Sequence, residues 1–360
     1  MEVLTIMSYF LKKSIPCNLN GKENVGLSNY HFRRGTVNDA LCIASLFQLG
    51  YGKSSHPCND EEYVRIALTS EDDYWFVAED EFSSVIGCLC ISYNLMHRTW
   101  EIGKAMISPL HRQLGVMSRL MRLSIDSTPI SMSDLIFIEL RSDTSYHTLQ
   151  KYVDVVIVGY DGGLNTVGKG SEHHVIAIAK FSSDKCFRHC FPNEPVFVES
   201  SYLRENIISP LGLSREVDEY PSRCFFWGGG GRGESDFLFS MDKQCNLIRL
   251  GQYIGSDSAS EKDVFSALCK FLKCFDTDVR VTSIVIADKL MLITDMICIG
   301  FRITSYLPAW YWLNGKRYDC LMLVRGGGDY VRDNGLGDYV KKFDVAYHDI
   351  EEKIIKKRWG

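Results

Sequence analysis

The chain has 360 residues, a length that favours two domains of roughly 150–180 residues each. Its composition, 46% hydrophobic and 24% charged, is that of a globular protein and excludes a wholly disordered chain. The formal net charge of -5 offers no basic surface for nucleic acid. The best apolar run, residues 279–301, contains Asp288, Lys289 and Asp295, which a bilayer would penalise. We therefore expect neither a nucleic-acid nor a membrane partner.

The thirteen cysteines do not form a disulfide pattern. Their number is odd, no CxxC pair occurs, and several lie inside apolar runs, where free cysteine packs as a small hydrophobic residue. The one group with metal-ligand character, Cys186, His189 and Cys190, lacks a second half at zinc-site spacing. We expect no metal site, and the free cysteines favour a cytoplasmic protein.

Hydrophobic periodicity and turn residues predict alternating strands and helices after a loose lead-in at residues 1–29. In the first half we expect strands at 30–34, 74–78, 85–93, 100–107, 135–140 and 174–181, and helices after Asp39 and at 60–68, 115–125 and 144–152. In the second half we expect strands at 195–198, 237–239, 281–286, 302–308 and 319–323, and helices at 262–275 and 289–299.

This alternation indicates an α/β (α+β) protein with a mixed sheet. The closing order of the second half, strand, helix, strand and strand, matches 135–181 in kind, so we infer a degenerate internal repeat. The predicted domains are 30–181 and 182–325, followed by a tail at 326–360 that is Gly-rich and then basic and helical. The tail helix is expected to be a charged surface helix that packs on the second domain.

The segment from Trp100 to Met121 carries the most chemical information. A strand leads into a loop that contains Arg112-x-x-Gly115, and the loop opens directly into a helix. The unpaired N–H groups and positive dipole end of a helix N-terminus can bind a pyrophosphate, and glycine permits close backbone approach. Many strand-to-helix turns, however, contain glycine for geometry alone.

The order of elements around this loop resembles that of the GCN5-related N-acetyltransferase (GNAT) superfamily over about residues 30–181. The pyrophosphate signature of that family is Q/R-x-x-G-x-G/A, which the sequence matches at Arg112 and Gly115. It departs at Met117, where the family has a small residue. The resemblance implies a mixed central sheet of the GNAT type and acetyl-CoA as co-substrate, without a metal.

A second stretch is similar to the closing part of the same fold. It runs through Ile299-Gly-Phe301, Ser305 to Pro308, and Gly315 to Met322 with its Tyr-Asp. No second RxxGxG precedes it, and the glycine run at 228–231 lacks the flanking strand and helix of a phosphate loop. The resemblance therefore implies a tandem protein whose second half is a degenerate GNAT-like domain.

The resemblance also assigns candidate site residues. Backbone groups at Met106 and Ile107 are expected to bind the pantetheine arm of the coenzyme. The pyrophosphate is expected at Arg112, Gln113, Leu114, Gly115, Val116, Met117 and Ser118. Glu101 stands where several family members carry a glutamate base, although an exposed strand carboxylate is an equal alternative.

The family acid is a tyrosine, for which Tyr152 is the nearest candidate. Tyr146 and Tyr160 are rivals, and any of them can instead be a buried structural residue. His147, His173 and His174 could titrate near neutrality, but histidines near strand ends are mostly structural.

The resemblance implies an acetyl-CoA-dependent N-acyltransferase that acts on a primary amine, either a small molecule or a peptide. One alternative is a non-catalytic binding or regulatory module; another is a different acyl-CoA reaction on the same fold, such as O-acyl transfer or decarboxylation. The acidic segments 60–62 and 71–73 suit a cationic amine, or are ordinary surface charge.

Overall fold

The computed structural model describes residues 29–52, 56–131, 134–163, 165–167, 170–180, 188–213, 216, 218–228, 232–233, 236–242, 246–276, 278–326 and 335–359. The predicted lead-in lies outside the described residues except for its last position. The chain forms two compact units. The first comprises Met1–Val155, Val167–Lys169 and Ala177–Cys186, and the second comprises Val156–Thr166, Gly170–Ile176 and Phe187–Gly360.

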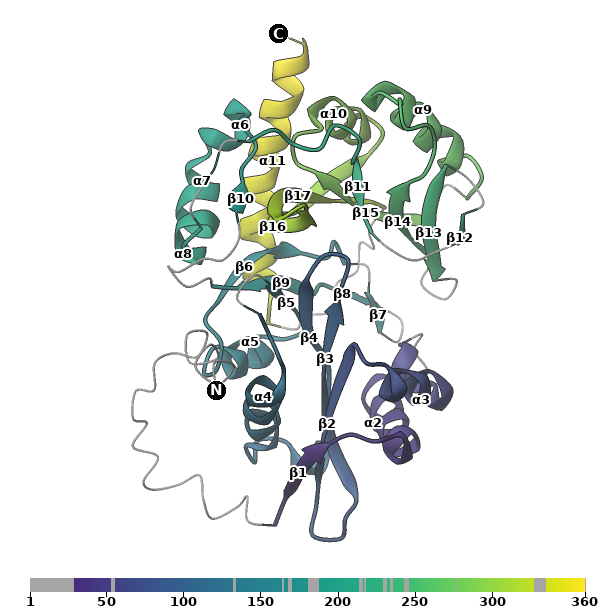
Figure 1. Cartoon of the computed structure of the whole chain (residues 1–360), viewed down its shortest axis with the longest axis vertical. Coiled ribbons are helices and arrows are strands. Elements are labelled where there is room, and N and C mark those ends of the chain that lie inside the picture. Colours follow the sequence, from purple (N-terminus) through teal and green to yellow (C-terminus); the bar gives the residue numbers. More distant parts are fainter. Residues whose placement is uncertain are drawn as a thin grey trace. The chain divides into compact units, whose positions relative to one another are not determined.

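The first unit is built on five strands that lie side by side in chain order (Figure 1). Its elements are β1 (His31–Arg34), η1 (Val37–Asp39), α2 (Ala40–Tyr51), η2 (Pro57–Asn59), α3 (Glu61–Thr69), β2 (Asp73–Glu79), β3 (Val85–Asn94), β4 (Thr99–Ile107), η3 (Pro109–His111), α4 (Val116–Ser127), β5 (Leu135–Leu140) and α5 (Asp143–Leu149). Strands β1 to β4 are antiparallel to their neighbours, whereas β4 and β5 are parallel and α4 connects them.

Helices cover both faces of this sheet, with α4 on one side and α2 and α3 on the other (Figure 1). Helix α2 follows Asp39 as expected, and its apolar positions Ile43, Ala44 and Phe47 are buried against the sheet. Asp60 caps α3 by accepting a hydrogen bond from Glu62 N at 2.9 Å, which satisfies one free donor of the first turn.

Four strands follow α5, and their residues are divided between the two units: β6 (Val155–Tyr160), β7 (Asn165–Val167), β8 (Gly170–Glu172) and β9 (Val175–Ala179). Strand β6 was not expected from the sequence. Its residues are apolar at every position except Gly159 and Tyr160, so the two-residue alternation that marks a half-buried strand is missing.

The second unit also contains a mixed sheet, with the strand order β6-β16-β17-β15-β14-β13-β12. Its further elements are β10 (Arg188–Cys190), α6 (Pro195–Val198), α7 (Ser201–Leu203), η4 (Arg204–Ile208), α8 (Ser209–Leu211), β11 (Phe226–Trp227), β12 (Arg232–Gly233), β13 (Phe237–Asp242), β14 (Leu247–Tyr253), α9 (Glu261–Leu272), β15 (Arg280–Ile286), α10 (Leu290–Cys298), β16 (Phe301–Leu313), β17 (Lys316–Arg325) and α11 (Gly337–Trp359). The fold class, mixed α/β with a mixed sheet, is as predicted.

The two units share one arrangement of strands. In the first, the antiparallel pair β3 and β4 is followed by the parallel pair β4 and β5 with α4 between them. In the second, the antiparallel pair β13 and β14 is followed by the parallel pair β14 and β15 with α9 between them. The last strand, β17, lies beside β15 and runs antiparallel to it.

The prediction of a strand at 195–198 is wrong, because Pro195–Val198 is helical. Val and Phe favour strands, but proline occupies the first turn, where its fixed φ suits a helix and its missing N–H is not needed. Val198 N then donates to Glu194 O at 3.0 Å. Strand β14 was not expected from the sequence because Gly251 interrupts its apolar pattern.

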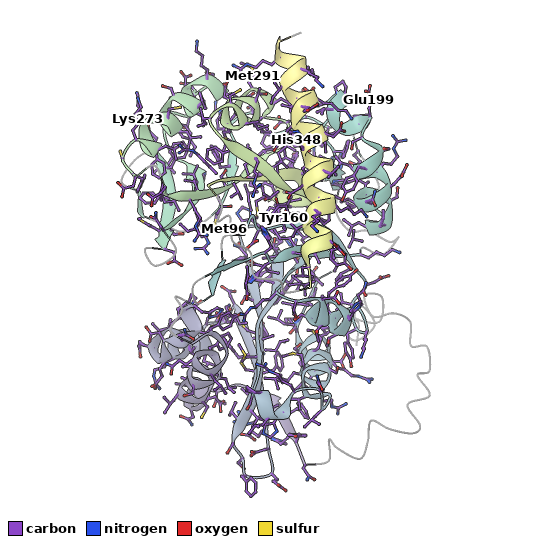
Figure 2. The ribbon with its side chains drawn as sticks, turned by 180° about the vertical axis from the view of Figure 1, so that it is seen from behind. Met96, Tyr160, Glu199, Lys273, Met291 and His348 are labelled. Carbon is purple, nitrogen blue, oxygen red and sulfur yellow. The ribbon has the colours of Figure 1, made fainter. Side chains whose placement is uncertain are left out.

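The tail helix α11 packs on the second unit, as expected (Figure 2). Tyr160 lies beside it and donates a hydrogen bond to Asp344, while Tyr347 accepts from Tyr306 N at 3.1 Å. The buried side chains of α11 are Val340, Phe343, Tyr347, Ile350 and Ile354. No helix within the described ranges is long and apolar enough to cross a membrane.

Candidate functional site

The predicted base, Glu101, lies in the middle of β4 on the face of the sheet that α2 and α3 cover. It is the register partner of Ser92 on β3, and residues that face each other in an antiparallel pair project to the same side. Its carboxylate lies over Gly103, where an added Cβ would be 3.1 Å from Glu101 Oε1. Glycine at 103 therefore leaves the space that the carboxylate occupies.

Beside Glu101, strand β4 contains a bulge. The register with β3 shifts between the pairs Cys90–Gly103 and Cys88–Met106, and Lys104 in this interval has a φ of 48°. A non-glycine residue at such a φ is strained and persists only where its surroundings hold it. Here the ammonium of Lys104 donates to Ser92 Oγ at 2.7 Å and lies 3.4 Å from Asp73 Oδ1.

Burial and charge set the protonation states of this pair. Desolvation raises the pKa of Glu101, the positive Lys104 opposes that rise, and Glu139 and Asp73 add to it. For Lys104, burial lowers the pKa, but Cys90, Asp73 and Glu101 outweigh this effect and raise it. Lys104 thus stays protonated near neutral pH, beside a carboxylate that takes up a proton more readily than an ordinary glutamate.

Strands β4 and β5 pair only in part. Their register runs from Thr99–Leu135 to Ile102–Ile138, and both strands continue beyond it, β4 to Ile107 and β5 to Leu140. In the described part of the chain no further ladder pair joins them. Beyond Ile102 and Ile138 the two strands are therefore not joined to each other by the described ladder.

Of the two residues expected to contact the pantetheine arm, Ile107 turns its backbone groups toward β5. Ser108 N donates to Ile86 O on β3 at 2.8 Å. Because hydrogen-bonded and non-hydrogen-bonded pairs alternate along an antiparallel ladder, the N–H and C=O of Ile107 point away from β3. Met106 is also buried, and its side chain packs beneath Gly50 of α2.

The loop that precedes α4 carries the predicted pyrophosphate site. Gly115 is the N-cap residue with φ 82° and ψ 0°, the left-handed region that glycine adopts without strain. No side chain caps this N-terminus, and the first turn holds no acidic residue. The N–H groups of the first turn and the positive end of the helix dipole are therefore free to receive an anion.

The residues around Gly115 are accessible where a ligand would need them. Arg112, Gln113, Leu114 and Gly115 are exposed, whereas Val116 is buried in the core. Arg112 Nε donates to Ile107 O at 3.2 Å, which ties the loop to the end of β4. The remaining predicted contacts, Met117 and Ser118, are half-buried in the first turn of α4.

The predicted acid, Tyr152, lies in the turn after α5, where its N–H donates to Leu149 O at 2.9 Å. Helix α5 packs against α4, on the side of the sheet opposite the Glu101 carboxylate. No hydrogen bond joins Tyr152 to Glu101 among the described residues. The structure thus places the two predicted catalytic groups on different elements without direct contact.

The rival tyrosines and histidines have structural partners. Tyr146 accepts a hydrogen bond from Gln150 Nε2 at 2.6 Å, and Tyr160 bonds to Asp344 within the second unit. His147 lies 3.2 Å from Asp143 one helical turn away. His173 packs edge-on against the ring of Tyr160, and burial lowers its pKa. His174 N donates to Asp161 Oδ1 at 3.0 Å.

The acidic segments at 60–62 and 71–73 are largely engaged in local contacts. Asp60 caps α3, Glu61 and Glu62 form ion pairs with Arg65, and Asp73 meets Lys104. These pairings leave less negative charge for a cationic acceptor than the sequence pattern indicates.

Sequence reasoning missed Lys104, Ser92 and Asp73, a hydrogen-bonded group whose charges act on the predicted base. One signal was present: a lysine inside the otherwise apolar end of a strand, Gly-Lys-Ala-Met-Ile, requires a partner where it is half-buried. Its partners come from β2 and β3, so the contacts form only when the sheet does.

Comparisons with known proteins bear on the same part of the chain. Residues 43–129 match the sequence model of the acetyltransferase (GNAT) family. A comparison with curated protein sequences gives no match. The matched region begins within α2 and contains α3, the bulged strand β4, the loop at Gly115 and α4.

Several solved structures are similar at low identity. A ribosomal-protein-S5-alanine acetyltransferase from Vibrio fischeri is 19% identical over 43% of this chain and 94% of its own, with a TM-score of 0.36. A dodecameric spermidine N-acetyltransferase from Vibrio cholerae is 18% identical over 43% and 95%, with a TM-score of 0.34. A GNAT-family acetyltransferase from Streptococcus pneumoniae is 15% identical over 41% and 98%, with a TM-score of 0.35. Through its match at residues 43–129, the chain carries a domain of the GNAT acetyltransferase family.

Proposed function

We propose that the first unit transfers the acetyl group of acetyl-CoA to a primary amine. The observation that carries this proposal is the uncapped N-terminus of α4 at Gly115, which follows the partly paired strand β4 after a short loop that contains η3. The residues present fit the coenzyme: the first turn of α4 would hold its pyrophosphate, and the backbone N–H of Ile107, whose carbonyl accepts from Arg112, would bond to its pantetheine arm. When bound, acetyl-CoA supplies an activated thioester as the acyl donor.

The residues of the first unit then have distinct roles. Glu101, ionised, takes a proton from the acceptor ammonium, either directly or through a water molecule, and so produces the amine that attacks the thioester carbonyl. The thiolate leaving group needs a proton, for which Tyr152 is the proposed donor. Lys104 is proposed to keep Glu101 ionised against its desolvation.

The second unit is proposed to be a degenerate GNAT-like domain, and residues 30–181 and 182–325 are proposed as the two domains. Support comes from the shared strand arrangement, in which a parallel pair with an intervening helix follows an antiparallel pair in each unit. Acceptor chemistry belongs to the first unit in this proposal, because Glu101 and the loop at Gly115 lie there.

The test is an acetyl-transfer assay with polyamines, amino acids, aminoglycosides and peptides, which follows free thiol and identifies acetylated products by mass spectrometry. We expect thiol release that depends on one class of amine, and a fall of about 10²–10⁴-fold in rate for Glu101→Gln with nearly unchanged coenzyme affinity. Coenzyme binding without thiol release would favour a non-catalytic module. A rate within a few-fold of wild type for Glu101→Gln would exclude Glu101 as the base.

A further inference from the structure

The parallel strands β14 and β15 of the second unit pair over only part of their length. Their register covers Leu247–Arg280 to Leu250–Ser283, after which β14 continues to Tyr253 and β15 to Ile286. This repeats the partial pairing of β4 and β5 in the first unit. In both units the two parallel strands therefore separate at their C-terminal ends, where the described ladder no longer joins them.

In the second unit a segment of the same chain bonds to one of these separated ends. Strand β11 runs antiparallel to the far end of β15, with Phe226 opposite Val285 and Trp227 opposite Ile284. The ladder is extended by Ile286 N, which donates to Phe225 O at 2.9 Å. The strand thus bonds to the part of β15 that β14 no longer reaches.

The same segment also contacts β14. A Cβ added to Gly228 would lie 2.9 Å from Gly251 Cα, so the two glycines are in close backbone contact. The ring of Phe225 packs edge-on against that of Tyr253 at 6.1 Å between centroids, and Phe226 packs against Phe237 at 5.6 Å. Phe225 and Phe226 are both buried. Residues 225–228 are therefore fixed between the far ends of β14 and β15.

Helix α9, which follows β14, differs from its counterpart α4 in the capping of its N-terminus. Ser260 and Asp263 form a capping box at the N-terminus of α9, and Glu261 adds a second carboxylate to its first turn. The box satisfies the N–H groups of Ser260 and Asp263, and the two carboxylates place negative charge where a phosphate would need positive charge. At α4 the N-cap is glycine and the first turn is free of acidic residues.

From these two independent observations we infer that residues 225–228 take the place of a coenzyme in the second unit. The pantetheine arm is an extended chain with two amides, and such a chain would bond to strand ends as an added strand does. In the second unit β11 makes those bonds, and the capping box of α9 excludes the pyrophosphate. The chain therefore binds one coenzyme, in the first unit, and this count rests on the function proposed above.

The test is hydrogen–deuterium exchange of the full chain with and without acetyl-CoA, combined with calorimetric stoichiometry. We expect slow exchange at 225–228 and 284–286 without coenzyme, no change there when acetyl-CoA is added, and one coenzyme per chain. Faster exchange at 225–228 upon addition of acetyl-CoA, or two coenzymes per chain, would overturn the inference. Missing protection at 103–107 and 113–118 would instead count against the function proposed for the first unit.

A variant tests the close contact between Gly228, next to β11, and Gly251 of β14. Gly228→Val should collide with Gly251, displace β11 and speed exchange of the Ile286 amide by about tenfold or more, while 280–283 stay protected by β14 and β17. The matched control is Gly315→Val, since Gly315 also has a positive φ but open space around it. If Gly228→Val does not fold, Phe225→Ala, which removes the contact with Tyr253, serves in its place. An Ile286 amide as slow as in wild type in a folded variant would refute the role of β11.

Discussion

A charge placed at the N-terminus of α4 tests the coenzyme site most directly. Gly115 has φ 82° and ψ 0°, a conformation that asparagine and aspartate tolerate better than other side chains. Gly115→Asp and Gly115→Asn therefore impose a similar backbone strain and similar bulk, and they differ in one negative charge. The difference between the two variants isolates the electrostatic contribution to binding.

The size of that difference follows from Coulomb's law. An aspartate at the N-cap would lie about 5 Å from a phosphate that the first-turn N–H groups bind. One pair of unit charges at that distance contributes about 0.8 kcal/mol at the dielectric constant of water and about 3 kcal/mol at an effective value of about 20. Because residues 112–115 are exposed, intermediate screening applies. Against the two charges of a pyrophosphate we expect about 2–4 kcal/mol, or about 30- to 700-fold weaker binding.

Isothermal titration calorimetry with acetyl-CoA at low and high salt measures this effect. Gly115→Asp should bind weakly at low salt, and its deficit relative to Gly115→Asn should shrink in about 1 M salt, where the Debye length falls to about 3 Å. Thermal unfolding serves as the control for folding. Equal losses in the aspartate and asparagine variants would show that shape, not charge, matters, and unchanged affinity in both would refute the assignment of the pyrophosphate to this loop.

The other predictions concern the base, the loop and the second unit. Because burial raises the pKa of Glu101 and Lys104 opposes the rise, the acid limb of kcat/KM should lie above the range of an ordinary glutamate. In Lys104→Met this limb should move to higher pH, whereas Lys104→Arg should retain it, and an unmoved limb would show that Lys104 does not act on the base. Met117→Ala should bind acetyl-CoA at least as tightly as wild type, and a large loss by calorimetry would show that methionine contacts the coenzyme. Ser260→Ala removes the cap of α9 and should lower the free energy of unfolding by about 0.5–2 kcal/mol in urea titrations, with Ser258→Ala as the control.

Linkage gives the sign of the pH dependence of stability at Glu101. A carboxyl whose pKa is higher in the folded than in the unfolded chain binds protons more tightly in the folded state. Its charged form is therefore destabilising, and stability from this group falls as pH rises through the two pKa values. Glu101→Gln removes that loss, so the variant should be at least as stable as wild type at neutral pH. This retained stability would separate a catalytic role from a structural one.

Local sequence was sufficient for the elements whose signals lie within one segment. The helix after Asp39 is marked by its apolar period, strand β5 by an apolar run that only Glu139 interrupts, and the loop at Gly115 by the RxxG spacing. These features depend on neighbours a few residues away, and propensity and periodicity describe such neighbours well. The predicted GNAT resemblance rests on the same local signals.

Contacts between distant segments decided the rest. Lys104 becomes a partner of Ser92 and Asp73 only because β2, β3 and β4 align in one register with a bulge. Strand β11 has two residues and no periodicity, and it exists because β14 and β15 stop pairing and leave backbone groups that must be satisfied. The helix at Pro195–Val198 reverses a strand-like composition, because four residues carry too little intrinsic preference to resist their flanking contacts. Sequence alone predicted most helices and strands of the first unit and the glycine loop that opens α4, whereas the tertiary structure decided which charge lies beside Glu101 and which end of a parallel strand pair the chain fills by itself.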